Sequence, residues 1–457
     1  MIELFRSYFP LILTGLFIYK AQREPIYYLG IPFLMFFGST IFMEKMRIFY
    51  MPGSITGFLG DGFFIFLWLL VSIFFINYQI KQIHYKIYPG RQKKNITDKI
   101  IFTLFLYSVI LLITNIIFYK DLFSILPIYL NYIYLFIGYF LFKKVFSKFS
   151  TEDIYKFFEI IVIINTITVV FFILYNLLGM SIYDEKVQGV VESITQGQLI
   201  KRVYTFVPIL MPFSFFYVFS KPKKKKTDYM IIVINFLGLF LTYTRSILIN
   251  TLLGLIIFYL VKNYKSQKFS KSIFVFSGVS IALVIAFFVL NTILPAQTAF
   301  LADRIIPLIQ DPTSISSNSL IVRQHYIEDI FKYINSINFI FGFGFVSTNL
   351  EQLAHYATKS GSADTVWLEW TFRFGIIGSS LLLSLFIVSI YNGFKSIKRI
   401  SPDSINFIGI VIAQIFFVFM TGFISWTIIE PGKYALALWF FAVFSVLLSR
   451  IQKPDYA

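Results

Sequence analysis

The sequence predicts an all-α polytopic integral membrane protein that forms a single transmembrane domain over residues 1–457. Hydrophobic residues make up 57% of the chain and charged residues 14%, which is not the composition of a soluble globular protein. Apolar runs of about 20 residues recur, long enough for helices to cross a hydrocarbon core of about 30 Å, and they indicate roughly 12 to 14 transmembrane helices. The runs do not alternate apolar and polar residues, which excludes the strands of a membrane barrel.

Basic residues give the expected orientation of these helices. A net charge of +17 would indicate a nucleic-acid partner in a soluble protein. Here most Lys and Arg residues lie in short segments between apolar runs, which the positive-inside bias explains, so no nucleic acid is expected. The strongest such segment is Lys-Pro-Lys-Lys-Lys-Lys at residues 221–226. The chain has no cysteine, which excludes disulfides and thiolate chemistry.

The first half of the chain is expected to contain six or seven of the spans. The N-terminal pair, residues 8–19 and 26–43, is separated only by Lys20, Arg23 and Glu24, so the number of spans there stays open. Clear apolar stretches then follow at residues 62–80, 100–119, 124–142, 154–178 and 204–220.

A close pair of short helices is expected between the basic segments 221–226 and 262–271, because about 35 residues separate them and both ends belong in the cytoplasm. Its outer turn then falls near Tyr243, Thr244 and Arg245. The remaining spans are expected at residues 273–294, 367–391, 407–424 and 434–448, which leaves the C-terminus inside.

Two polar segments are expected outside the membrane, residues 179–203 and the much longer residues 294–366. Within the second, apolar residues recur at helical spacing over residues 320–334, which predicts an amphipathic helix on the outer membrane face. Much of any chemistry should occur in this long segment, because it is polar enough to lie in water.

Three arginines are expected on the outer side, against the positive-inside bias. Arg245 lies at the outer turn, Arg202 where the first external loop re-enters the membrane, and Arg323 on the amphipathic helix. A guanidinium is planar, always charged and bidentate, which suits a diphosphate. Tyr243 is a possible supporting residue beside Arg245. Each arginine could instead lie at the membrane interface with only a structural role.

Carboxylate and imidazole groups supply the candidate bases. Asp364 precedes a membrane helix, where it could cap the helix or act as a general base towards a hydroxyl. His355 is the alternative base. Glu369 and Arg373 lie one helical turn apart and could form an ion pair, or a functional pair if buried in the membrane. No metal-ligand spacing is found, so no metal or other cofactor is expected.

Five motifs occur in a characteristic order. They are Thr244-Arg245-Ser246, an arginine-bearing helix (Arg323), Phe341-Gly-Phe-Gly344, Asp364-Thr-Val-Trp-Leu368 and Phe374-Gly-Ile-Ile-Gly378. With the expected topology, residues 187–383 resemble the O-antigen polymerase (Wzy) and O-antigen ligase superfamily of bacterial inner-membrane glycosyltransferases. The resemblance implies a GT-C-like fold and a site on the periplasmic face that needs neither a metal nor a nucleotide sugar.

The resemblance also implies the substrates and the residue roles. Donor and acceptor would be glycans linked to undecaprenyl diphosphate, among membrane lipids, with a chain-length regulator as a further partner. Arg245, helped by Arg202 or Arg323, would hold the diphosphate, and Asp364 or His355 would assist the acceptor. Ligases of this superfamily commonly carry His-Asn where this chain has Asp364-Thr365, and the difference favours a polymerase that inverts the anomeric carbon.

Two alternatives remain open. A ligase would transfer the finished glycan to lipid A core or to a protein. A flippase or transporter of lipid-linked oligosaccharides would also be polytopic, but transporters tend to place broken helices and charges near the middle of the membrane, often in repeated halves. This chain instead concentrates its polar residues in one long external segment.

Overall fold

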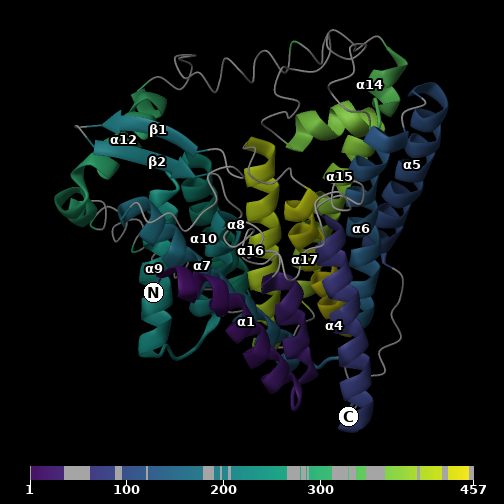
Figure 1. Ribbon diagram of the computed structural model, residues 1–457, viewed down its shortest axis with the longest axis horizontal. Coiled ribbons are helices and arrows are strands. Elements are labelled where there is room, and N and C mark those ends of the chain that lie inside the picture. The colour runs from purple at the N-terminus through teal and green to yellow at the C-terminus, as the bar shows by residue number, and fades with distance from the viewer. Residues whose placement is uncertain are drawn as a thin grey trace.

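The structure, a computed structural model, is a bundle of long helices that run between two ends (Figure 1). It describes residues 2–34, 62–87, 95–119, 122–178, 190–195, 198–203, 207–264, 278, 285, 288–310, 328, 336–345, 366–398, 402–424 and 431–451. Within these ranges five helices are long and apolar enough to cross a membrane, Ile96–Phe118, Thr151–Leu177, Ser246–Asn263, Trp370–Ile397 and Ile405–Gly422. The predicted class, a helical multi-pass membrane protein, is confirmed.

The elements follow the order of the predicted apolar runs. The first part of the chain contains α1 (Ile2–Ala21), the short 3-10 helix η1 (Pro25–Leu29), α4 (Gly62–Gln82), α5 (Ile96–Tyr119), α6 (Leu122–Phe146) and α7 (Thr151–Leu178). The second part contains β1 (Val190–Thr195), β2 (Gln198–Val203), α8 (Val207–Ser220), α9 (Lys226–Leu241), α10 (Arg245–Asn263), α12 (Pro295–Gln310), α14 (Ile337–Phe341), α15 (Val366–Ile397), α16 (Pro402–Ile424) and α17 (Pro431–Ile451).

The two segments predicted to lie outside the membrane contain structure that the sequence did not predict. Strands β1 and β2 form an antiparallel hairpin within the first of them, with Thr195 opposite Gln198 beside the turn. Helix α12 occupies the start of the second. The predicted amphipathic helix at residues 320–334 lies outside the described residues except for Glu328, and it stays a prediction.

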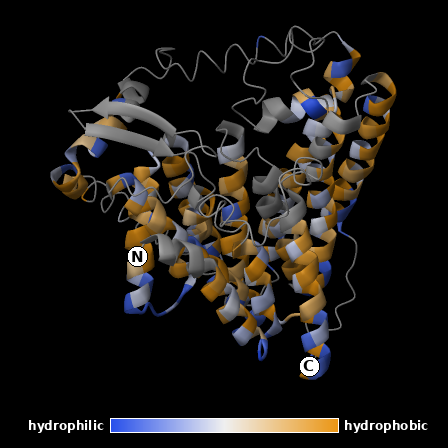
Figure 2. Cartoon of the chain, in the orientation of Figure 1, coloured by the Kyte–Doolittle hydropathy of each residue, from blue (hydrophilic) through white to orange (hydrophobic). Residues whose placement is uncertain are grey.

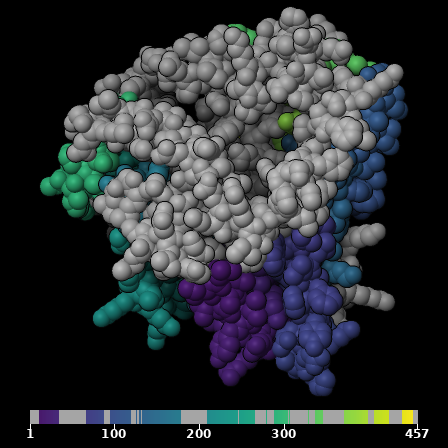
Figure 3. All heavy atoms as spheres, in the orientation of Figure 1, coloured from purple at the N-terminus to yellow at the C-terminus, as the bar shows by residue number. Residues whose placement is uncertain are grey.

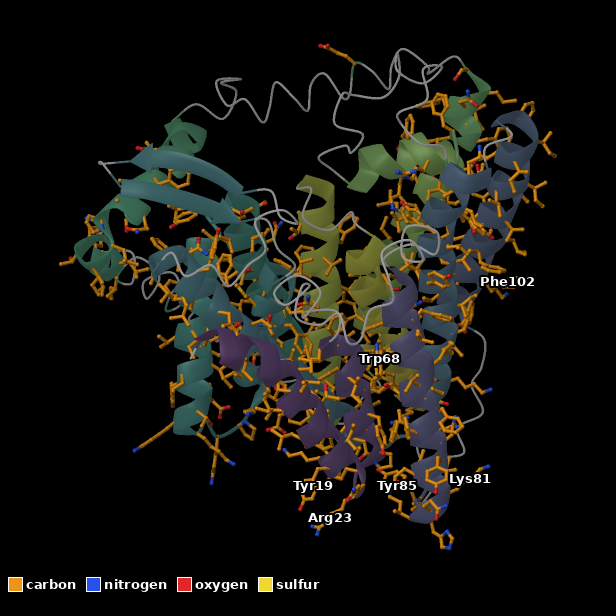
Figure 4. The ribbon with its side chains drawn as sticks, in the orientation of Figure 1. Tyr19, Arg23, Trp68, Lys81, Tyr85 and Phe102 are labelled. Atoms are coloured by element: carbon orange, nitrogen blue, oxygen red, sulfur yellow. The ribbon has the colours of Figure 1, made fainter. Side chains whose placement is uncertain are left out.

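Basic residues gather at one end of the bundle, here called the basic end, where Figure 2 shows hydrophilic helix tips. The turn after α1 lies there, because Gln79 Nε2 of α4 donates a hydrogen bond to Gln22 O (2.6 Å) and Lys156 Nζ lies 3.0 Å from Glu24 Oε1. Figure 4 shows Arg23 and Lys81 at this same end. Helix α1 therefore ends on the side where α4 ends.

The N-terminal helices form the lower part of the face that Figure 3 shows, in purple and indigo, with η1 packed against both α1 and α4. At the opposite end lie the β1–β2 hairpin, α12 and α14 (Figure 1). We call this the loop end. The candidate site residues that the structure describes belong to elements of the loop end.

Helix α16 lies at the centre of the bundle. It packs against α8 and α10 on one side and against α15 and α17 on the other. Asn250 Nδ2 of α10 donates a hydrogen bond to Thr421 Oγ1 of α16 (3.1 Å), and Phe386 of α15 contacts Phe419 of α16 with ring centroids 5.3 Å apart. The first residues of α10 and of α15 therefore lie on different sides of α16.

Candidate functional site

The turn between α9 and α10 forms where the sequence predicts it. Thr242 N–H donates to Gly238 O (3.1 Å), and Thr244 Oγ1 donates to Thr242 O (3.0 Å). Tyr243 has a positive φ of 50°, an uncommon conformation for a non-glycine residue. The turn is buried, and Tyr243 is only 1% exposed. It delivers Arg245 as the first residue of α10, where the helix dipole also favours an anion.

Helix α12 covers this turn and connects it to the hairpin. The rings of Tyr243 and Phe300 meet edge to face at 5.1 Å, and α12 contacts both β1 and β2. Arg202 lies in β2, opposite Val191. The segments that carry Arg202 and Arg245 are therefore both packed against α12, at the left of Figure 1. The structure describes only the backbone of these two arginines, so their shared role stays a prediction.

Tyr243, predicted as a supporting residue, is a packing residue of this arrangement. Its phenol is buried, and burial raises its pKa, so the hydroxyl stays neutral. The ring that contacts Phe300 fixes the position of the turn, and through the turn the first residue of α10.

A second arrangement of the loop end surrounds a break in α15. At Gly375 the backbone leaves the helix, with φ 62° and ψ −170°, inside the candidate span Trp370–Ile397. Two carbonyls before the break accept hydrogen bonds from another segment, Phe372 O from Phe343 N–H and Arg373 O from Gly344 N–H, both at 2.8 Å. Non-helical backbone at membrane depth persists only where such partners exist.

Three glycines make the close approach possible. Gly342, Gly344 and Gly375 have φ values of 85°, 76° and 62°. A Cβ on Gly342 would lie 2.2 Å from Arg373 O, and one on Gly375 would lie 2.2 Å from Ile340 O. Phe341-Gly-Phe-Gly344 therefore forms a tight turn in close backbone contact with the broken helix.

Helix α5 holds both backbones in place. Asn115 Nδ2 donates to Phe343 O (2.8 Å), and Phe345 N–H donates to Asn115 Oδ1 (2.7 Å). Tyr107 Oη donates to Phe341 O (2.7 Å) and lies 3.2 Å from Phe374 O. We call Asn115 with residues 343–345 the Asn115 clamp. Asn115 is 5% exposed, so this amide is as buried as the backbone that it holds.

Sequence reasoning missed both α5 residues. Asn115 and Tyr107 lie in an apolar run, and a buried amide in a membrane helix is a signal for an interhelical hydrogen bond. Their partners lie 228 and 234 residues further along the chain, so no local pattern could identify them.

The structure describes only some of the other predicted site residues. Arg373 lies on the first half of α15, two residues before the break, and is partly buried. Glu369 lies one turn before it, and only its backbone is described. Arg323, His355 and Asp364 lie outside the described residues. Their catalytic and binding roles stay predictions.

In the part of the chain that the structure describes, no three side chains of His, Asp or Glu gather into a group that could hold a metal ion. The expectation of a metal-independent site stays a prediction.

One protein-family model matches the chain. Residues 230–383 match the family described as O-antigen ligase, and a search of curated proteins found no match. The matched segment begins in α9 and ends in α15, so it contains the α9–α10 turn, α12 and the clamp around Gly375. The resemblance carried by the motifs is confirmed over residues 230–383, which are similar to the O-antigen ligase family.

Proposed function

We propose that this protein is a polysaccharide polymerase that joins oligosaccharide repeat units carried on undecaprenyl diphosphate. The family match over residues 230–383 supports a glycan-transferring membrane enzyme, and Asp364-Thr365, where ligases of the superfamily commonly have His-Asn, favours the polymerase. The matched segment contains the turn that begins α10 at Arg245, and it contains the broken helix α15. These are the two arrangements of the loop end that could hold a donor and an acceptor.

The basic end would face the cytoplasm and the loop end the periplasm of a bacterial inner membrane. Lysines follow the ends of α4 and α6 and fill the α8–α9 turn, as the positive-inside bias requires of a cytoplasmic face. Lipid-linked glycan would then reach the site from the outer leaflet. The chemistry would occur at the loop end.

The diphosphate of the donor would lie over the start of α10. Arg245 begins that helix, and Arg202 lies on the strand packed against α12, which covers the same turn. Arg323 would approach from the long external segment. Preorganised guanidinium groups stabilise the negative charge that develops on the leaving diphosphate, which can lower the barrier by several kcal/mol.

The acceptor would lie at the start of α15. Asp364 precedes the first residue of that helix by two positions. In the proposed step it accepts the proton of a sugar hydroxyl as the hydroxyl oxygen bonds to the anomeric carbon. The bond from that carbon to the diphosphate oxygen breaks, and the anomeric carbon inverts. Asp364→Asn should reduce turnover more than carrier binding, and an unchanged rate would make His355 the better candidate.

Ligase activity is the second candidate, because the matched family is described as O-antigen ligase. Asp364-Thr365, where ligases of the superfamily commonly have His-Asn, favours the polymerase. The break in α15 is a feature that transporters also use. Here the clamp occupies the carbonyls before the break, Phe372 O and Arg373 O, so these groups are not open to a transported ligand.

One assay distinguishes the three activities, which are polymerisation, ligation and translocation. Purified protein is incubated with lipid-linked repeat unit alone, in EDTA, and the products are resolved by length. Polymer on undecaprenyl diphosphate supports the proposal. Product that forms only when lipid A core or a protein acceptor is added supports a ligase. Translocation across vesicles without bond formation contradicts both and supports a flippase.

A further inference from the structure

Three lysines from separate segments converge at the basic end, on the surface between α4 and α6. Lys148, in the turn after α6, donates a hydrogen bond from Nζ to Asn77 Oδ1 of α4 (2.5 Å). Lys81 lies one helical turn after Asn77, on the same face of α4, and Figure 4 shows it at the lower end of that helix. Lys144 is the third member, near the end of α6. We call these residues the triple-lysine cluster.

The cluster concentrates positive charge. Burial lowers the pKa of Lys148, and repulsion from Lys144 and Lys81 lowers it further, so the three ammonium groups act on one another. Among the described residues no carboxylate forms an ion pair with any of the three. A cluster of this kind can bind an anion.

Two carboxylates on adjoining helices have other partners. Asp98 pairs with Lys143 (2.5 Å). Asp153 accepts hydrogen bonds from Tyr85 Oη (2.7 Å) and Ser150 Oγ (2.6 Å). Neither forms an ion pair with a lysine of the cluster among the described residues, so the three ammonium groups can bind an external anion.

The surface next to the cluster is apolar and open. Phe74 and Tyr78 are 67% and 53% exposed, and they precede Lys81 at helical spacing, so they continue the same stripe of α4 towards the membrane. A ligand that covers both parts needs an anionic head and a hydrocarbon chain. A free phosphate would use only the lysines.

We infer that the triple-lysine cluster binds the phosphate headgroup of an anionic phospholipid whose acyl chain lies along Phe74 and Tyr78. The positive-inside bias requires lysines at this end but does not require three of them to converge. Clusters of Lys beside a membrane helix bind anionic headgroups, and each lysine adds to the affinity. The site lies at the end opposite the proposed reaction, so it is independent of that proposal.

The test uses the purified full-length protein, delipidated and then titrated with phosphatidylglycerol, with bound lipid counted by native mass spectrometry. Lys81 and Lys144 are exposed, so the double variant Lys81→Gln/Lys144→Gln should fold normally, and thermal unfolding checks this. Lys395→Gln/Lys398→Gln is the matched control, with the same charge change on exposed lysines at the same end.

We expect the cluster variant to bind phosphatidylglycerol roughly tenfold or more weakly than the wild type, because two cationic contacts are lost. The control should bind like the wild type. Equal weakening in both variants would mean a general charge effect and overturn the inference. So would equal affinity for zwitterionic phosphatidylethanolamine, or displacement of the lipid by millimolar inorganic phosphate.

Discussion

Replacing Asn115 with alanine should release the loop that holds α15 in its broken form. The variant loses the donor to Phe343 O and the acceptor for Phe345 N–H. Phe343 and Phe345 are 4% and 0% exposed, so water cannot take over these bonds. Each buried backbone group left without a partner costs about 1–3 kcal/mol, which sums to roughly 2–6 kcal/mol. Interhelical hydrogen bonds in membranes average about 0.6 kcal/mol each, so the lower part of that range is the firmer expectation.

A loss of about 2 kcal/mol at the clamp should affect activity more than global stability. The clamp fixes the first half of α15 and with it the position from which Asp364 would approach the acceptor. Because about 1.4 kcal/mol corresponds to a factor of ten in rate, polymerisation by Asn115→Ala should fall at least tenfold. The assay is polymer formation from lipid-linked repeat unit, with kcat and KM determined separately beside thermal unfolding in detergent.

Asn165→Ala is the matched control for the clamp. Asn165 is also a buried amide, and its Nδ2 group donates to Ser214 Oγ (3.0 Å) and Asn235 Oδ1 (2.9 Å) between α7, α8 and α9. It should lose comparable thermal stability while keeping kcat. If kcat fell equally in both variants, the Asn115 clamp would be an ordinary packing contact with no specific effect on catalysis. An Asn115→Ala enzyme with wild-type kcat would refute the reasoning outright.

Three further substitutions test other parts of the fold and site. Gly375→Ala places a Cβ 2.2 Å from Ile340 O at a φ of 62°, so the yield of folded protein should drop sharply; wild-type thermal stability would contradict the assigned break. Asp98→Ala removes the carboxylate from buried Lys143, whose Nζ lies 2.5 Å from it, and should cost about 3–5 kcal/mol, measured as a lower unfolding temperature than that of the wild type. Arg245→Ala should abolish long polymer while single repeat units remain, and a normal ladder of chain lengths in this variant would exclude the role. Arg245→Lys should retain only part of the polymerisation activity, because lysine lacks the bidentate guanidinium group.

The parts of the fold that follow from local chemistry were predictable. The α9–α10 turn was expected near Arg245 because basic segments at residues 221–226 and 262–271 fix both ends of a short pair on one side. The hairpin could also have been found. Residues 190–203 are rich in β-branched residues on both sides of a central Gln-Gly pair, which is a pattern of a two-stranded hairpin.

The break in α15 could not be read from the sequence in the same way. A lone glycine in an apolar helix is usually tolerated without a kink. What makes Gly375 non-helical is a pair of backbone contacts from residues 342–344 and an amide from α5. These partners are long-range, and their contribution exists only after the helices have packed.

The two sides of the proposed site are held in place by different long-range contacts. The long segment predicted to be external carries Asp364 and Arg323, and it ends in a helix whose first half is held by residues 343–344 and, through them, by Asn115 of α5. The arginine side is fixed separately, by the turn that Tyr243 and Phe300 hold at the start of α10. Helix α16 packs against both α10 and α15, so the spacing between the two sides depends on a helix that contributes no predicted site residue. Substitutions on the α15 face of α16, such as Phe419→Ala, should therefore alter kcat without weakening diphosphate binding.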